Sequence, residues 1–181
     1  ANSGAGILKD LGPHLIDQAL NLFGLPQAVF ADIRITRAHS LVDDYIDILL
    51  YYPDVRVRLK AGFFVREAIP SYVIHGKKGS FLKVRGDVQE DDLKLAKKPN
   101  LDIWGKEPKT KEGILHTEIN NDVLIEKIPT LQGNYYDFFD GVYNSISKDM
   151  PEPVTAQDGV HVMQIIEAAI LSNNQKKVID L

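Results

Sequence analysis

Hydrophobic residues near the start of the chain recur at the 3.6-residue spacing of an α-helix. In residues 7–23 they gather on one broad side of the predicted helix, at Leu8, Leu11, Leu15, Ala19, Leu22 and Phe23. Gly24 and Pro26 follow, and these residue types commonly end a helix. Because Pro13 lacks a backbone N–H, we expect the helix either to begin near Leu11 or to carry a kink.

Further along, short apolar segments separated by turn residues are typical of antiparallel strands. Residues 28–37 alternate apolar and more polar positions, as a half-buried strand does. Three hairpins follow, with strands at residues 44–52 and 55–65 around Pro53-Asp54, within residues 71–84 around Gly76 and Gly79, and at residues 113–119 and 123–128 around Asn120-Asn121-Asp122. Sequential hairpins favour a largely antiparallel sheet with one face covered.

Two further helices are predicted near the end of the chain. Residues 135–147 place apolar side chains at intervals of three or four residues. Residues 155–174 open with Thr155 and, three residues later, Asp158, which is a capping-box pattern. The tail, residues 177–181, could add one last strand. The pattern predicts an α+β fold, in which a largely antiparallel or mixed open β-sheet carries helices packed on one face.

A long polar connection, residues 86–113, separates the second hairpin from the third. It is rich in charge, is interrupted by Pro99 and Pro108, and holds the only tryptophan of the chain, Trp104. A connection of this length inside a compact domain is unusual and often functional. The alternative is a solvated excursion over the surface.

Composition narrows the class of protein. The 181 residues suit one domain or one domain with a long insertion. A net charge of −4 with interspersed acids and bases gives no footprint for nucleic acid or an anionic membrane. The chain has no cysteine, which excludes disulfides and thiol catalysis and favours the cytoplasm. No apolar run is long enough to span a bilayer. Because the chain starts at Ala1 without a signal peptide, we expect it to begin partway through a longer protein.

One side of the first helix carries groups suited to acid–base chemistry. Asp10, His14, Asp17 and Asn21 fall within about 60° of each other on a helical wheel. Asp10 and His14 are four residues apart, so their side chains can reach each other. A carboxylate that accepts a hydrogen bond from one imidazole nitrogen fixes the tautomer and leaves the other nitrogen free to take a proton. The alternatives are a solvent-facing polar stripe and a metal site, for which the spacing selects no particular metal.

A dinucleotide-binding fingerprint is not supported. Gly4 and Gly6 give G-x-G, but Lys9 occupies the third glycine position and no strand precedes the motif. The sequence GKKGS at residues 76–80 joins two predicted strands and is expected to be a turn, not a phosphate-binding loop.

Two motifs at opposite ends of the chain are informative in combination. They are D-x-x-x-H-x-x-D at Asp10, His14 and Asp17, and P-V-T-A-x-D-G at residues 153–159. With these motifs, the strand pair at residues 72–83 and the sequence IWGKEP at residues 103–108, the chain resembles the glucose–fructose oxidoreductase / inositol dehydrogenase / MocA family over nearly its whole length. Within that family it is most similar to the sugar and polyol dehydrogenases of the scyllo-inositol dehydrogenase kind.

The resemblance implies a protein about twice as long as this chain. An N-terminal Rossmann domain would bind NAD or NADP, and residues 1–181 would be the C-terminal domain that supplies the substrate site and the subunit contacts. By resemblance, His14 is the acid–base group on the substrate hydroxyl, and Asp10 holds its ring and contacts the substrate. A lysine of the nucleotide-binding half is expected to complete the site, so the isolated chain should be inactive.

Two more residues are candidates for substrate binding. We expect Asp17 either to contact a substrate hydroxyl or to satisfy neighbouring donors, and Trp104 either to border the substrate cleft or to pack at the surface. The sequence therefore predicts half of an NAD(P)-dependent sugar or polyol dehydrogenase that forms homo-oligomers through its sheet. The alternative function is a non-catalytic oligomerisation or ligand-binding domain.

Overall fold

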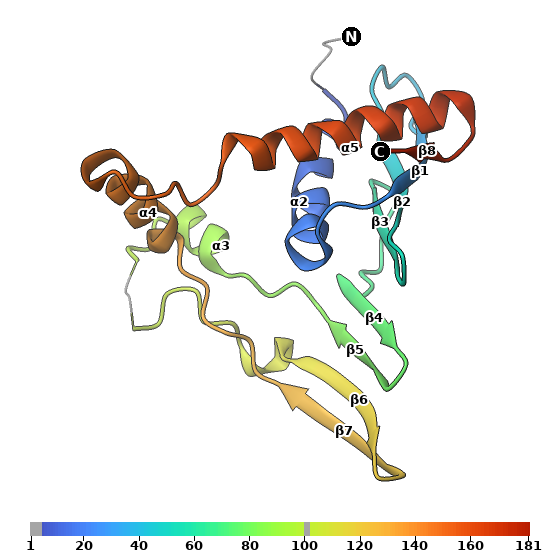
Figure 1. Ribbon diagram of the computed structural model, residues 1–181. Helices are drawn as coiled ribbons and strands as arrows, with labels where there is room; N and C mark the ends of the chain where they lie inside the picture. Colours follow the sequence, from blue (N-terminus) through green and yellow to red (C-terminus); the bar gives the residue numbers. More distant parts are fainter. Residues whose placement is uncertain (1–4, 100–101) are drawn as a thin grey trace. The chain divides into compact units, whose positions relative to one another are not determined.

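A computed structural model describes residues 5–99 and 102–181 of the chain (Figure 1). The chain divides into two compact units, the first formed by Ala1–Arg66 and Val154–Leu181 and the second by Glu67–Pro153. Each unit has its own four-stranded sheet, and every strand pair is antiparallel. The predicted α+β class and the antiparallel pairing are confirmed. The strands form two separate sheets, whereas the sequence pattern predicted one.

The first unit contains three helices and sheet A among its described residues. The helices are α1 (Ile7–Asp10), α2 (Gly12–Phe23) and α5 (Ala156–Gln175). Sheet A has the strand order β3-β2-β1-β8, in which β1 is Ala28–Arg34, β2 is Tyr45–Tyr51, β3 is Arg56–Gly62 and β8 is Ile179–Asp180. The predicted last strand in the tail is therefore confirmed, because β8 pairs with β1.

The core of the first unit lies between the helices and one face of sheet A. Register explains which strand residues enter it, since Ala31 of β1 lies opposite Ile48 of β2, and Ile48 lies opposite Leu59 of β3. Alternate residues of a strand share a face, so β2 buries every second side chain. The helices add a matching apolar side, which includes Leu8 of α1, Ile16 of α2 and several residues of α5. The helix α5 packs against β1 of this sheet (Figure 1).

Pro13 explains why the first helical segment is divided. The predicted helix of residues 7–23 is present, but Leu11 separates α1 from α2 and Pro13 lies in the first turn of α2. A proline is tolerated there because the first N–H groups of a helix have no partner within the helix. The predicted end of α2 is confirmed, since Gly24 has φ 73° and donates its N–H to Leu20.

The capping box of the long C-terminal helix is also confirmed. The Thr155 hydroxyl accepts the N–H of Asp158, and the Asp158 carboxylate accepts the N–H of Thr155. These hydrogen bonds hold the pKa of Asp158 below its ordinary value. Although α5 is 20 residues long, no helix of the described residues is long and apolar enough to cross a membrane.

The second unit is built around sheet B, with the strand order β4-β5-β6-β7. The strands are β4 (Tyr72–Gly76), β5 (Gly79–Lys83), β6 (Gly113–Ile119) and β7 (Asp122–Ile128). The two hairpins predicted within residues 71–84 and 113–128 are present, each with a two-residue turn. Asn120 and Asn121 have φ 54° and 68°, a conformation that asparagine tolerates better than most residues.

The long connection before β6 contains more structure than its sequence indicated. It includes α3 (Gln89–Lys94) and the 3₁₀ turn η1 (Lys109–Lys111), and α4 (Tyr135–Lys148) follows β7. We expected an irregular loop because α3 is six residues long, with one apolar side chain, and therefore shows no helical periodicity. An i,i+4 ion pair between Glu90 and Lys94 lies along this short helix.

Candidate functional site

The predicted acid–base residues lie together on the outward side of the first helical segment. Asp10 is the last residue of α1, and His14 and Asp17 belong to α2. All three side chains are exposed, whereas Leu8 and Ile16 on the inward side are buried at 2% and 0% exposure. Burial of the inward side therefore fixes which residues the helix presents to solvent. We call Asp10, His14 and Asp17 the acid–base stripe.

The expected contact between the first two stripe residues is not formed. Among the described residues no hydrogen bond or ion pair joins Asp10 to His14, and the break at Leu11 falls between them. The backbone still continues across the break, because Leu11 donates to the carbonyl of Ile7 and Leu15 donates to that of Leu11. Hydrogen bonds between catalytic groups are often long without substrate and tighten in the complex, so exposure on a common side is the relevant geometry.

A buried carboxylate fixes the loop that leads into β2, near the start of α1. Asp44 has 0% exposure and accepts hydrogen bonds from the backbone and hydroxyl of Thr36 and from the backbone and guanidinium of Arg37. Burial alone raises the pKa of Asp44, but these hydrogen bonds outweigh it and hold the pKa well below its usual value. Arg37 also lies over the ring of Phe63, 4.3 Å from its centroid. These contacts therefore hold the loop of residues 35–44 against sheet A.

Trp104 lies in the second unit, whereas the acid–base stripe lies in the first. The tryptophan is 5% exposed, and its carbonyl accepts a hydrogen bond from Gln132 at 2.6 Å. Its neighbour Gly105 has φ 72°, and its carbonyl accepts the N–H of Gly133 at 3.1 Å. The indole Nε1 is buried and has no hydrogen-bond partner among the described residues. A buried N–H donor without an acceptor lowers the stability of the fold, so this indole would gain from pairing with another polar group.

A buried glutamine, which the sequence did not single out, joins this loop to the start of α4. Gln89 is 3% exposed, and its Oε1 accepts the N–H of Tyr135 while its own N–H donates to Asp87. A polar side chain at the start of a short helix gives no sequence signal of burial. On the other side of the connection, Lys83 Nζ lies 2.5 Å from Glu107 Oε2, and Thr130 donates to the same oxygen.

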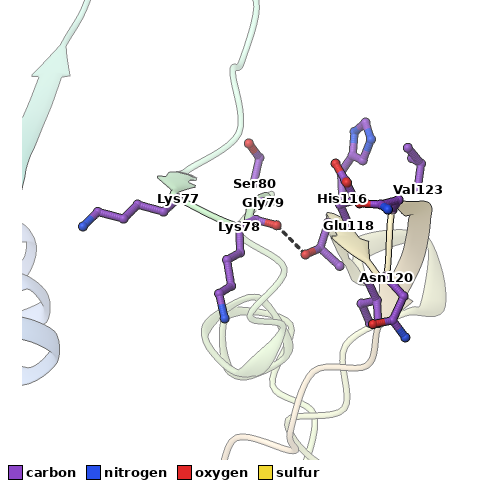
Figure 2. Close-up of a pocket in the computed structure, with 11 residues that line it drawn as sticks. Lys77, Lys78, Gly79, Ser80, His116, Glu118, Asn120 and Val123 are labelled. Carbon is purple, nitrogen blue, oxygen red and sulfur yellow. Dashed lines mark hydrogen bonds between the residues drawn. The ribbon is translucent and has the colours of Figure 1, made fainter.

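A hollow of the second unit lies at the turn end of sheet B. Lys77 and Lys78 of one turn line it together with His116, Glu118 and Asn120 of the adjacent hairpin, and Figure 2 shows the Lys77 side chain pointing away from that hairpin. The hollow has a volume of about 850 Å³. The hydroxyl of Thr117, one of its lining residues, donates a hydrogen bond to the carbonyl of Lys78. None of the predicted site residues lines this hollow. Within the described residues, no group of three or more His, Cys, Asp or Glu side chains could hold a metal ion.

Sequence comparison identifies the class of protein. Residues 1–181 match the oxidoreductase family, C-terminal alpha/beta domain, and the chain belongs to this family of glucose–fructose oxidoreductase / inositol dehydrogenase / MocA proteins. The chain is 40% identical over 176 residues to scyllo-inositol 2-dehydrogenase (NADP(+)) IolW of Bacillus subtilis, a match that covers 97% of this chain and 49% of that protein. It is 32% identical over 178 residues to the uncharacterized oxidoreductase YdgJ of Escherichia coli, covering 98% of this chain and 51% of that protein.

Solved structures agree with the sequence relationships. The yvaA protein of Bacillus subtilis has a TM-score of 0.96 with 39% identity and is matched over 100% of this chain and 52% of that chain. An oxidoreductase from Bacillus cereus has a TM-score of 0.88 with 31% identity, over 100% of this chain and 54% of that chain. The chain thus spans about half the length of the relatives it matches. The predicted family membership is confirmed.

Proposed function

We propose that this chain is the substrate-binding half of an NAD(P)-dependent oxidoreductase that interconverts a secondary alcohol and a ketone of a sugar or polyol. The observation that carries the proposal is the exposed acid–base stripe on a helix whose inward side is buried in the core. The 40% identity to a scyllo-inositol 2-dehydrogenase (NADP(+)) supports a polyol as the substrate class and NADP as the cofactor.

His14 serves as the acid–base group in this proposal. Oxidation of a secondary alcohol requires a base that takes the hydroxyl proton, and reduction of the ketone requires an acid that returns it. Imidazole does both near neutral pH, and the exposed ring of His14 is open to a bound substrate. The nicotinamide, when bound, accepts or donates the hydride.

The other candidate residues orient the reactants. Asp10 accepts a hydrogen bond from the imidazole once substrate closes the site, and so selects the tautomer with a free nitrogen toward the hydroxyl. Asp17, one turn further along the exposed side of α2, contacts a second substrate hydroxyl. The family resemblance of its loop supports a place for Trp104 at the border of the substrate cleft, although its indole Nε1 is buried in this structure.

The cofactor is assigned mainly to residues outside this chain. Gly6, one of the two glycines in the incomplete G-x-G-x-x-G pattern, precedes the four-residue helix α1. The Asp43 carboxylate occupies the space where a side chain of Gly6 would lie, so a carboxylate already lies beside this glycine. A pyrophosphate needs a glycine-rich turn between a strand and a helix, together with free N–H groups. We therefore assign binding of NAD(P) and a catalytic lysine to an N-terminal Rossmann domain, and expect the 181-residue chain alone to be inactive.

We assign a homo-oligomer formed through sheet A as the working form, and the lack of cysteine favours the cytoplasm as its location. Its helices pack on one face, and the other face carries Phe30, Leu49 and Tyr51 beside the ion pair between Asp47 and Arg58. A mixture of apolar, aromatic and charged side chains is also the usual composition of a non-obligate subunit interface. A non-catalytic protein that only oligomerises through this face is the second candidate function.

One experiment separates the two functions. The full-length protein and the 181-residue chain are each mixed with NADPH or NADP and with a panel of inositols, other polyols and ketoses, and the nicotinamide absorbance is followed. We expect turnover with at least one polyol or its ketone for the full-length protein and none for the chain alone. Absence of turnover across the panel, with stable oligomers by light scattering, would favour the non-catalytic alternative.

A further inference from the structure

The helix that ends in Asp10 is too short to be stable by itself. It has four residues, Ile7–Asp10, and its N-cap is Gly6, which has no side chain to accept a backbone N–H. A single turn fixes several residues for very few hydrogen bonds, so isolated turns do not persist in water. The orientation of Asp10 must therefore be set by contacts from elsewhere in the fold.

Asp43, in the loop before β2, supplies those contacts. Its carboxylate Oδ2 accepts the N–H of Leu8 at 2.7 Å, and its carbonyl accepts the N–H of Ile7 at 2.9 Å. Ile7 and Leu8 are buried, at 4% and 2% exposure, and Asp43 is half-buried, so both hydrogen bonds are partly removed from water. Asp43 thus caps a helix far from it in the sequence, since Leu8 lies 35 residues before it.

Glycine at position 6 is part of the same arrangement. Its φ is 112°, and a Cβ added there would overlap the Asp43 carboxylate. The carbonyl of Gly6 in turn accepts the N–H of Asp10 at 3.0 Å. The turn that Asp43 caps therefore includes the backbone of Asp10 itself.

Asp43 is held by a neighbour that cannot move easily. Asp44 is fully buried, donates its N–H to the carbonyl of Arg34 and accepts the N–H of Phe63 at its own carbonyl. Its carboxylate is occupied by Thr36 and Arg37. Adjacent residues 43 and 44 thus form a bridge between sheet A and the start of α1.

We propose that Asp43 is a positioning residue for the acid–base stripe: it fixes the turn that carries Asp10, so that Asp10 and His14 face the substrate together. The proposal rests on the proposed function, because the stripe is given its chemistry there. In this role Asp43 acts through the backbone of residues 6–10.

The test uses the full-length protein and a double-mutant cycle. Asp43→Ala, Asp43→Asn and the control Asp54→Ala, at an exposed position in the turn between β2 and β3, are made in the wild-type and His14→Ala backgrounds. Steady-state kinetics are measured after circular dichroism has established the folded fraction. Hydrogen exchange of residues 7–17 is measured for each variant, with residues 156–175 of α5 as the internal reference.

We expect Asp43→Ala to lower kcat about 10- to 100-fold with KM within about threefold, because misplacement of a catalytic group by about 1 Å costs this much. Asp43→Asn retains an acceptor oxygen and should stay within about threefold of wild type. In the His14→Ala background, Asp43→Ala should change kcat less than about twofold, because Asp10, which it positions, no longer has an imidazole to orient. Asp54→Ala should be neutral in both backgrounds.

Two results would overturn the proposal. One is an equal loss from Asp43→Ala in both backgrounds, which indicates a general loss of folded protein. The other is unchanged exchange at residues 7–10 in Asp43→Ala, which shows that the contact does not hold α1. The exchange readout does not depend on activity, so it decides the proposal even if the full-length protein turns over no polyol, the result that removes the proposed function instead.

Discussion

The buried hydroxyl of Ser172, near the end of α5, accepts the backbone N–H of Ala31 on β1 at 3.0 Å. The same hydroxyl donates to the carbonyl of Lys177 at 2.6 Å, and Asn173 Oδ1 accepts the N–H of Ile33. β8 pairs with only Ala28 and Val29, so the helix continues the ladder where the short strand ends. A helix thereby closes an edge of sheet A that would otherwise leave buried N–H groups without partners.

Ser172→Ala should destabilise the protein. The substitution leaves the N–H of Ala31 buried without an acceptor, which costs about 1 to 3 kcal/mol. The free energy of unfolding in urea measures the loss. Asn174→Ala, two residues along the same helix and exposed, is the matched control and should change stability by less than about 0.5 kcal/mol. Equal effects of the two substitutions would contradict the role of the hydroxyl.

Gly105→Ala should disturb the surroundings of Trp104. Gly105 has φ 72°, and a Cβ there would overlap the carbonyl of Gly133, so the backbone must move. The left-handed conformation alone costs a non-glycine residue about 1 to 2 kcal/mol. Because Trp104 is the only tryptophan, fluorescence reports this site directly, and we expect a red shift of the emission as the indole becomes wetter. An unshifted spectrum would show that the loop tolerates the side chain.

Gly159→Ala should have the opposite effect and stabilise the protein. Gly159 lies in the first turns of α5, and a Cβ added there meets nothing within 4 Å. Replacing glycine by alanine in a helix removes conformational freedom from the unfolded chain, which contributes about 0.5 to 1 kcal/mol. Urea unfolding again provides the measurement, and a lower free energy of unfolding would indicate an unrecognised contact at this position.

The stability of the fold should fall in acid through Asp44. Its pKa is held well below the usual value of 3.8 in the folded state, so the carboxylate contributes stability above about pH 4 and loses it as the pH falls toward the folded pKa. Asp44→Asn should lower stability at neutral pH and flatten the decline between about pH 4 and pH 2. Urea midpoints at several pH values measure both. An unchanged acid decline in the variant would assign it to other carboxylates, such as Asp47, whose pKa is lowered by Arg58.

Local sequence patterns were sufficient for most elements of the fold. The apolar period of residues 7–23, the turn at Pro53-Asp54 and the capping box at Thr155 and Asp158 each act over a few neighbouring residues, and each predicted its element. The helix α3 was not predicted because its six residues show no apolar period. The buried side chain of Gln89 fixes its position through a hydrogen bond from the N–H of Tyr135. The division of the strands into two sheets depends on long-range pairing that no local pattern encodes.

The candidate site follows the same division between local and distant contacts. The outward side of Asp10, His14 and Asp17 could be predicted from helical spacing, because burial of the opposite side decides it. The break at Leu11 and the cap from Asp43 could not, since a contact across 35 residues leaves no periodic signal. Trp104 was singled out from the family resemblance of its loop, and the structure adds that its indole N–H is buried and unpaired among the described residues.

The central claim is that His14 moves the proton of the reaction, and one kinetic comparison tests it most directly. His14→Ala is measured in the full-length protein with its best polyol and cofactor, beside His161→Ala, whose ring lies on α5 and contacts Gln157. We predict that kcat falls at least about 100-fold in His14→Ala, the low end for loss of an acid–base group, and stays within about twofold in His161→Ala. Wild-type turnover in His14→Ala would contradict the account.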